Sequence, residues 1–246
     1  GKDQIEKYGV EPFIEQCKES VWKYEGMWED FSHTVGFWAD MKNPYVTYHN
    51  DYIESEWWAL KEIWKKGLLY EGHKIVPYCP RCGTPLSSHE VAQGYKDVKE
   101  RSAVVRFKVK GEDAYILAWT TTPWTLPSNV ALCVNPDEDY VKVTSKGYTY
   151  YMAAALVDTV LGEGAELLEH YQGKDLEFKE YEPLFPYAEK RIGNKKAYYV
   201  VCDTYVTLTD GTGVVHIAPA FGEDDSKVGH RYDLPFCLLY TSDAAD

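Results

Sequence analysis

The sequence predicts an α/β chain with a β-rich second part, in which a helical segment precedes a compact, barrel-like β domain. Two patterns carry this prediction. Apolar residues recur at spacings of three and four over residues 1–75, and they alternate with polar residues in short runs between about 99 and 220. With 246 residues, 45% hydrophobic and 15% aromatic, the chain is large enough to bury a core in one or two domains.

Two helices are expected in residues 1–75. The first has Pro12 in its first turn, where a helix tolerates proline, and its apolar stripe comprises Phe13, Ile14, Cys17, Val21, Tyr24 and Trp28. The stripe of the second comprises Ile53, Trp57, Leu60 and Trp64, with Gly67 as the C-terminal cap. Both stripes, including their tryptophans, are interpreted as core packing.

Residues 76–98 form a connector around a Cys-x-x-Cys turn. No secretory signal and no thioredoxin-like strand–helix context accompany Cys79 and Cys82, so a zinc knuckle is favoured over a redox pair. A tetrahedral zinc site needs four ligands, and His73 and His89 are the nearest histidines in the sequence. The connector therefore predicts half of a candidate zinc site.

The β-rich part begins with SAVVRFKV, residues 102–109, in which apolar residues alternate with Arg106 and Lys108. Gly111-Glu112-Asp113 then turns the chain into AYILAWT, which predicts a hairpin. Further strands are expected at VALCV, YVKVT, YTYYMA, AYYVVCD and GVVHIAP, with a short helix around AAALVDTVL. These elements predict a barrel-like domain with helical decoration.

The net charge of −13 argues against a surface that grips phosphate backbones along its length. One basic cluster surrounds a Gly-Asn turn, and it has two interpretations, a solvated hairpin tip or an RNA contact; it comprises Lys190, Arg191, Lys195 and Lys196. No apolar run approaches the roughly 20 residues of a membrane span. The charged opening GKDQIEKYG does not resemble a signal peptide, so a cytoplasmic protein is expected.

Three threonines stand together in WTTTPWTLPSN, residues 119–129. Thr120, Thr121 and Thr122 are β-branched and favour an extended backbone. Pro123 is expected to end the strand, because proline lacks a backbone donor and restricts the residue before it. The hydroxyls are therefore predicted to lie at a strand end.

A second signal is GTGVVHIAPAFGEDD, residues 211–225, which places His216 in a strand and Asp225 at a helix start. Taken singly, His216 is explained as a core histidine and Asp225 as a helix cap. Together with the threonines they predict a pocket suited to a small cationic amine with a polar carbonyl. The chain has no Gly-x-Ser-x-Gly elbow, no His-Glu-x-x-His motif and no Walker loop. Direct attack by water is then the most economical hydrolytic chemistry.

WTTTPWTLPSN and GTGVVHIAPAFGEDD resemble the editing domain of the isoleucyl-tRNA synthetases, a class Ia aminoacyl-tRNA synthetase family, and VPYCPRCGTPLSSHEVAQGY resembles the same family. Valyl and leucyl relatives typically carry arginine after two threonines, where this chain has Thr122. The resemblance implies that residues 1–75 belong to the helical part of a split Rossmann core, that 76–98 connect it, and that 99–236 form the inserted β-barrel-like editing domain. Residues 237–246 fall outside the resemblance as an atypical tail, interpreted as a sequencing artefact.

The resemblance also implies roles for the site residues in hydrolysing valine misattached to the isoleucine tRNA. Asp225 pairs with the α-ammonium group of valine, and Thr120, Thr121 and Thr122 bond the terminal ribose and the attacking water. His216 borders the side-chain pocket and helps to exclude isoleucine. No protein group is assigned as the general base, and Asn129 is expected to tie its turn together.

For the whole enzyme, the resemblance implies tRNA charging with ATP and Mg²⁺, whereas editing needs no cofactor. Neither ATP-site signature, of the His-Ile-Gly-His or the Lys-Met-Ser-Lys-Ser type, occurs in these 246 residues, so adenylate formation is not expected from this chain. The family's second Cys-x-x-Cys would complete the zinc site of Cys79 and Cys82. The expected partners are the CCA end of tRNA(Ile) carrying valine and the remainder of a monomeric synthetase, without a membrane.

Two alternatives remain open at this point. One is an editing domain of the valyl or leucyl type. The other is a catalytically idle module that binds tRNA or supports the fold.

Overall fold

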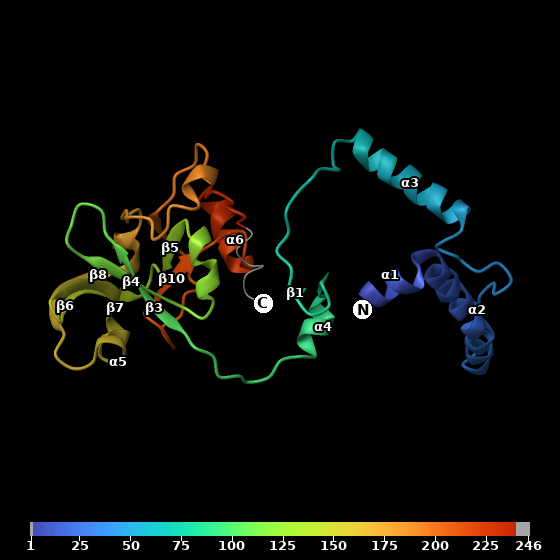
Figure 1. Cartoon of the computed structure of the whole chain (residues 1–246), viewed down its shortest axis with the longest axis horizontal. Helices are drawn as coiled ribbons and strands as arrows, with labels where there is room; N and C mark the ends of the chain where they lie inside the picture. Colours follow the sequence, from blue (N-terminus) through green and yellow to red (C-terminus); the bar gives the residue numbers. More distant parts are fainter. Residues whose placement is uncertain (1, 240–246) are drawn as a thin grey trace. The chain divides into compact units, whose positions relative to one another are not determined.

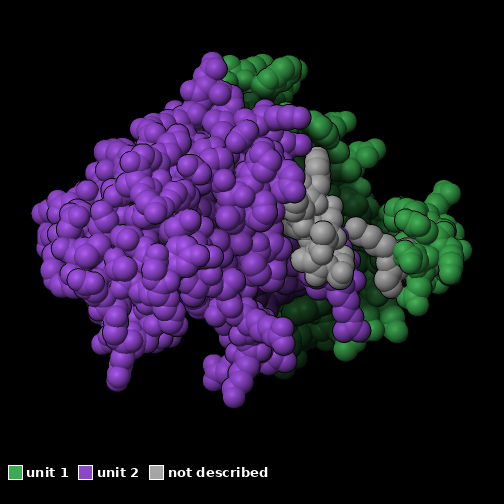
Figure 2. All heavy atoms as spheres, turned by 60° about the vertical axis from the view of Figure 1, so that its left-hand side comes forward, with its two compact units in different colours: residues 1–73 green, residues 74–246 purple. Residues whose placement is uncertain are grey.

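The computed structural model describes residues 2–239. The chain divides into two compact units, residues 1–73 and residues 74–246 (Figure 2). The expected tail falls largely on residues 240–246, which lie outside the described residues. Cys237, at its start, is buried in a hydrophobic cluster of the second unit.

The first unit is helical, as predicted. It contains α1 (Lys2–Tyr8), α2 (Val10–Thr34) and α3 (Asn50–Lys65), and residues 2–73 include no strand. Pro12 lies in the first turn of α2. Gly67 follows α3 with φ 68°, and its N–H donates to the carbonyl oxygen of Trp64 at 2.8 Å, which is the predicted glycine stop.

The interpretation of the two apolar stripes as core is wrong. Neither α2 nor α3 contains a buried residue, and Trp28, Trp57 and Trp64 are 66%, 67% and 69% exposed. A helical stripe becomes core only when a second layer covers it. Within residues 2–73 neither stripe has such a cover, although the periodicity predicted both helices correctly.

The second unit begins with a small knuckle. Strands β1 (Tyr78–Cys79) and β2 (Thr84–Pro85) pair antiparallel around the Cys-x-x-Cys turn. Helix α4 (Ser88–Ala92) follows and starts with a capping box between Ser87 and Glu90.

A mixed sheet forms the rest of this unit (Figure 1). Its strands run in the order β8-β6-β7-β4-β10-β5-β9, with β3 paired to β4. Their bounds are β3 (Ala103–Lys108), β4 (Tyr115–Thr120), β5 (Ala131–Val134), β6 (Asp139–Ser145), β7 (Tyr148–Ala153), β8 (Glu166–Gln172), β9 (Tyr199–Cys202) and β10 (Val214–Ile217). The prediction of a helical segment followed by a β-rich domain is thus confirmed.

Strand β4 joins the two halves of the sheet. On one edge it pairs with β3 along its whole length, as an antiparallel hairpin. On the other edge its first residues pair with β7, and Trp119 near its end pairs with Val215 of β10, both in parallel. Because this edge changes partner, the end of β4 lies beside β10.

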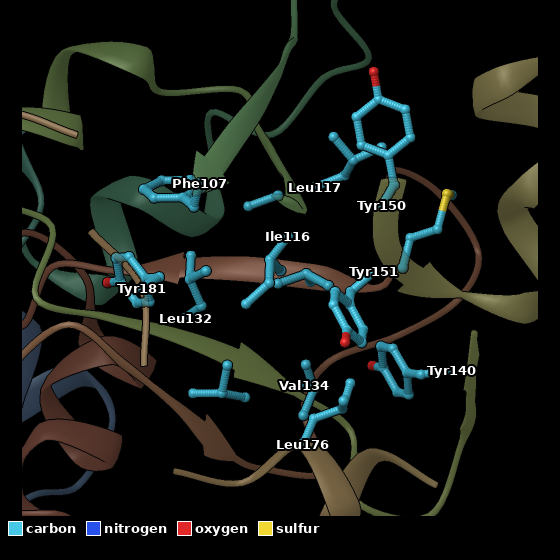
Figure 3. Packing of buried hydrophobic residues seen from close by; sticks show 14 of the residues in the cluster. Phe107, Ile116, Leu117, Leu132, Val134, Tyr140, Tyr150, Tyr151, Leu176 and Tyr181 are labelled. Atoms are coloured by element: carbon cyan, nitrogen blue, oxygen red, sulfur yellow. The ribbon is translucent and has the colours of Figure 1, made fainter. Parts of the chain in front are cut away.

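Two hydrophobic clusters lie on opposite faces of β5. Leu132 and Val134 belong to the first, which is formed by buried side chains from several strands of the sheet (Figure 3). Ala131 and Cys133 belong to the second, together with Val228 of helix α6 (Glu223–Arg231). Helix α6 is therefore anchored on the face of the sheet next to the end of β10.

Shorter helical elements complete the unit. They are η1 (Pro123–Ser128), η2 (Ala154–Leu156), α5 (Val157–Leu161), η3 (Gly173–Leu176) and η4 (Glu189–Arg191). The pair η2 and α5 is the predicted short helix. Strand β8 was not predicted, because almost all of its residues are exposed and it lacks apolar alternation.

The basic cluster is not a hairpin tip. Lys190 and Arg191 lie in the 3-10 helix η4. Lys195 forms an ion pair with Asp233 at 2.7 Å, and Lys196 forms one with Glu180 at 3.0 Å. Two of its four cations are thus neutralised within the fold.

Among residues 2–239, no helix combines the length and the apolar character needed to cross a bilayer.

Candidate functional site

The threonine run leaves the sheet earlier than predicted. Strand β4 ends at Thr120, and Thr122 has φ −122° and ψ 65°, outside the extended region. Pro123 starts the 3-10 helix η1 instead of ending a strand. The cause is a local side-chain bond: the N–H of Thr122 donates to Oγ1 of Thr120 at 3.0 Å and replaces a sheet bond.

His216 lies in β10 and is only 5% exposed. The antiparallel pairing of β10 with β5 places it opposite Leu132. Its strand position was predicted correctly.

Asp225 is the third residue of α6 and is not its cap. The N-cap is Gly222, which has no side-chain bond. Oδ2 of Asp225 accepts a hydrogen bond from the N–H of Ala218 at 2.9 Å. A Cβ on Gly222 would lie 2.9 Å from Cγ of Asp225, so the carboxyl group occupies space that only glycine leaves free. The connection from β10 to α6 therefore folds around this carboxyl group.

These residues line one cavity of about 230 Å³. Its walls comprise Trp119, Thr120, Thr121, Thr122, Thr125, Val215, His216, Phe221, Gly222 and Asp225. The parallel pairing of β4 with β10 explains the convergence, because the ends of both strands reach the same edge. All five residues predicted for the site from the threonine and GTGVVHIAPAFGEDD segments are thus brought together, and their catalytic roles stay predictions.

Thr125 belongs to the cavity and was missed by the sequence reasoning. Its Oγ1 donates to the carbonyl oxygen of Thr122 at 2.8 Å and lies 3.0 Å from Nε2 of His216. The signal was present, because a residue three positions after Thr122 returns to the same side of a 3-10 helix. It could be used only with knowledge that η1 is helical.

The bond to Thr125 holds the ring of His216 in place. Oγ1 of Thr125 is within hydrogen-bond distance of both the carbonyl oxygen of Thr122 and Nε2 of His216. Nδ1 is buried and has no partner among the described residues. Burial lowers the pKa of His216 to about 4. The ring is therefore neutral near pH 7.

Burial shifts the pKa of Asp225 in the opposite direction to that of His216. Burial raises the pKa of its carboxyl group to about 6, while the hydrogen bond from Ala218 works against this rise. A buried carboxylate without a cationic partner is costly. The site therefore favours a ligand that brings a positive charge to Asp225.

Asn129 is structural, as predicted. Its Nδ2 donates to the carbonyl oxygen of Ala131 at 2.8 Å, and its Oδ1 accepts from the hydroxyl of Tyr181 at 2.6 Å. Both amide ends are thereby used inside the fold.

In the Cys-x-x-Cys knuckle a backbone N–H group stabilises the thiolate form of a cysteine. The N–H of Cys82 donates to Sγ of Cys79 at 3.4 Å, and this bond lowers the pKa of the Cys79 thiol. However, residues 2–239 contain no group of three or more His, Cys, Asp or Glu side chains arranged to hold a metal. Cys79 and Cys82 thus fit half of a tetrahedral site and do not hold zinc by themselves.

Comparison with known proteins shows the family of the chain. Residues 1–212 match the family model of the class I tRNA synthetases (I, L, M and V). The chain is 62% identical to the isoleucine--tRNA ligase of Clostridium acetobutylicum over 240 residues, and 53% identical to that of Bacillus thuringiensis over 237 residues. These alignments cover 97% and 96% of this chain, and 23% of each relative.

A solved structure, the P. knowlesi cytosolic leucyl-tRNA synthetase editing domain, aligns with 55% of this chain and 67% of its own, at 13% identity and a TM-score of 0.42. The chain spans about a quarter of the length of the curated relatives that it matches. The match over residues 1–212 shows that the chain belongs to the class I tRNA synthetases of the I, L, M and V group.

Proposed function

We propose that this chain carries the proofreading site of an isoleucine--tRNA ligase, which hydrolyses the ester of valine misattached to tRNA(Ile). One observation carries the proposal: the threonine hydroxyls, the buried His216 and the carboxyl group of Asp225 line a single cavity of about 230 Å³. A cavity of this kind suits a small amino acid that bears an ammonium group and an ester carbonyl.

Asp225 would recognise the ammonium group. Its Oδ2 is held by the N–H of Ala218, which leaves Oδ1 to accept a charge-assisted hydrogen bond from the α-ammonium. The ligand's charge would also offset the cost of burying the carboxylate. A carboxylate that only capped a helix would not need a free oxygen atom facing a cavity.

The threonine turn would position the ester and the water. Oγ1 of Thr120 already accepts a hydrogen bond from the N–H of Thr122, which holds the Thr120 side chain in place, and both residues line the cavity. Water would attack the ester carbonyl carbon, and the bond from this carbon to the ribose oxygen would break. One proton of the water would pass to that ribose oxygen, and the other would be released to solvent from the new carboxyl group of valine. The products are free valine and uncharged tRNA.

His216 would act as a wall of the cavity and not as a base. Its Nε2 is hydrogen-bonded to Thr125, and a pKa of about 4 makes the ring a weak proton acceptor near pH 7. As a buried, fixed ring it would help to exclude the larger isoleucine side chain, because overpacking a tight site is unfavourable.

Exclusion is the physical reason why an enzyme of this type would need a second site. A synthetic pocket shaped for isoleucine loses only about 1 to 3 kcal/mol when one methylene is missing, so it admits valine. A smaller hydrolytic pocket that admits valine and rejects isoleucine corrects the error.

The test is ester hydrolysis with valine-charged and isoleucine-charged tRNA(Ile), using the chain, Asp225→Ala and the matched control Asp224→Ala. Asp224 is the preceding residue of the same helix, carries the same charge, and its side chain is 59% exposed. We expect selective loss of valine with the unchanged chain and the control, and none with Asp225→Ala. Equal hydrolysis by both variants, with folding verified by circular dichroism, would refute the site. Preference for threonine-charged tRNA(Val) would indicate a valyl-type domain.

For the longer protein we propose ATP-dependent charging of tRNA(Ile) with Mg²⁺, in a monomeric, cytoplasmic enzyme. Zinc would bind Cys79 and Cys82 with two further ligands from that protein. The thiol geometry of the knuckle supports this assignment.

A further inference from the structure

Basic and aromatic side chains share one face of strands β3, β4 and β7. Lys108 is paired with Tyr115 between β3 and β4, and Tyr115 with Tyr150 between β4 and β7. Arg106 lies two residues before Lys108, and Tyr148 two residues before Tyr150. Paired residues, and residues two apart on a strand, project to the same face. We name these five residues the aromatic-basic face.

The cations of this face lie over tyrosine rings. The guanidinium carbon of Arg106 is 5.0 Å from the ring centroid of Tyr148 and 5.5 Å from that of Tyr115, and Nζ of Lys108 is 4.8 Å from the centroid of Tyr115. Tyr148 is 47% exposed and Arg106 is exposed. In Figure 3 the hydroxyl of Tyr150 points away from that of its neighbour Tyr151, which faces the core.

The charge of Arg106 is not neutralised by the fold. No carboxylate within residues 2–239 forms an ion pair with it, whereas Lys108 pairs with Asp113. The whole chain has a net charge of −13. An uncompensated guanidinium beside the exposed Tyr148 is therefore an exception on an acidic protein, and it favours a polyanionic ligand.

The aromatic-basic face continues toward the candidate site. Trp119 is four residues beyond Tyr115 on β4 and projects to the same face, and it is one of the residues that line the cavity. Four residues of strand span about 13 Å. That length is about four nucleotides stacked at roughly 3.4 Å each.

We infer that the aromatic-basic face binds the unpaired 3′ segment of the RNA whose terminal ester enters the cavity. The inference rests on the proposed function and assigns its RNA-binding surface. Unpaired bases stack on tyrosine rings and on guanidinium planes, and cations contact the phosphates. Duplex RNA offers no free base faces, so the face selects a single strand.

The test measures fluorescence anisotropy of a 5′-fluorescein RNA octamer that ends in CCA. The variants are Arg106→Gln, Tyr148→Leu and the control Lys190→Gln, which removes an exposed charge from η4. We expect both face variants to raise the Kd about tenfold, as for loss of one stacked base, and the control to change it less than about twofold. Arg106→Gln should also lower the salt slope of log K by about 0.7, and Tyr148→Leu should leave it unchanged.

An equal loss of affinity with Lys190→Gln would show diffuse electrostatic binding and overturn the inference. So would an unchanged Kd in both face variants, or equal affinity for a hairpin without a single-stranded end. Thermal melts of each variant verify folding. If Tyr148→Leu melts at a lower temperature, Arg106→Gln still tests the inference, because glutamine keeps most of the aliphatic part of the arginine side chain.

Ester hydrolysis separates this inference from the proposed function. Arg106→Gln should raise KM for valine-charged tRNA about tenfold and leave kcat unchanged. Asp225→Ala should abolish hydrolysis and still bind the uncharged octamer. If Asp225→Ala abolishes hydrolysis but Arg106→Gln leaves both KM and Kd unchanged, the proposed hydrolytic site is supported and the proposed RNA-binding surface is refuted.

Discussion

Thr125 links the threonine turn to His216: its Oγ1 lies 2.8 Å from the carbonyl oxygen of Thr122 and 3.0 Å from Nε2 of His216. One hydroxyl therefore contacts both a backbone carbonyl after β4 and a buried ring in β10. The bond between Thr125 and His216 joins the segment after β4 to β10, so this wall of the cavity depends on it.

Replacing Thr125 by valine should destabilise the chain and loosen selectivity. Valine keeps the shape and removes the hydroxyl, which leaves Nε2 of His216 without its partner at a cost of about 1 to 3 kcal/mol. The carbonyl oxygen of Thr122 keeps its bond from the backbone N–H of residue 125, which is 3.1 Å long. We expect a lower urea midpoint and a smaller ratio of kcat/KM between valine and isoleucine esters. Thr125→Ser restores the hydroxyl and should recover both. Selectivity unchanged in Thr125→Val would contradict the positioning role.

Hydrolysis should depend on the ionisation of Asp225. Its pKa is raised to about 6 by burial, and only the carboxylate pairs with ammonium, so kcat/KM should fall as the pH drops through about 6. A pH–rate profile from 5 to 8 checks this expectation, with Asp224→Ala as the control. A flat profile across pH 6 would exclude Asp225 as the recognition group.

Asp225→Asn should raise stability at neutral pH while it abolishes hydrolysis. For an acid whose folded pKa lies above its unfolded value, the unfolded chain binds fewer protons between the two values, so stability falls as pH rises from 3.8 to about 6. Above that window the carboxylate costs up to about 3 kcal/mol. Urea unfolding at pH 7.5 measures the gain, and a loss of stability in Asp225→Asn would reverse the sign and refute the argument.

Gly222→Ala should displace the recognition carboxylate. The added Cβ would lie 2.9 Å from Cγ of Asp225, so the carboxyl group must move and kcat/KM for valine ester should fall roughly tenfold or more, as for a misplaced catalytic group. Gly26→Ala is the matched control, because a Cβ there meets nothing within 4 Å. Full activity in Gly222→Ala would show that the position of Asp225 is not critical.

Glu112 should stabilise the sheet far from the cavity. Burial alone would raise its pKa, but hydrogen bonds from Lys179, Tyr151 and Lys142, at 2.8 to 3.0 Å, lower it to about 2. Because this folded pKa is below the unfolded 4.5, the stabilisation is present above pH 4.5 and lost as pH falls toward 2.

Glu112→Gln should therefore cost about 1 to 2 kcal/mol at pH 7, discounted because the side chain is 27% exposed. The difference from the unchanged chain should vanish near pH 2. Thermal unfolding at both values tests this, with the exposed Glu166→Gln as the control. An equal difference at pH 2 and pH 7 would exclude an electrostatic origin.

Most helices and strands could be predicted from the sequence, because the spacing of apolar residues and the turn residues that define them lie within each element. Helical spacing predicted α2 and α3, and alternation around Gly111 predicted the hairpin of β3 and β4. The acidic run after β10 predicted the start of α6. Strand β8 escaped because its pairing with β6, and not an apolar alternation of its own, makes it a strand.

The sequence by itself determined which side chains line the candidate site, since threonines, a histidine and a carboxylate stood at strand ends. Only the tertiary structure decided how they meet. The parallel pairing of β4 with β10 brought Thr120 and His216 to one edge, the turn at Thr122 left the sheet through a side-chain bond, and Thr125 joined the site from a 3-10 helix. These are contacts between residues up to 91 positions apart, and local periodicity contains no information about such pairs. The same limit explains the exposed tryptophans of α2 and α3, whose pattern predicts a helix but not the layer that covers it.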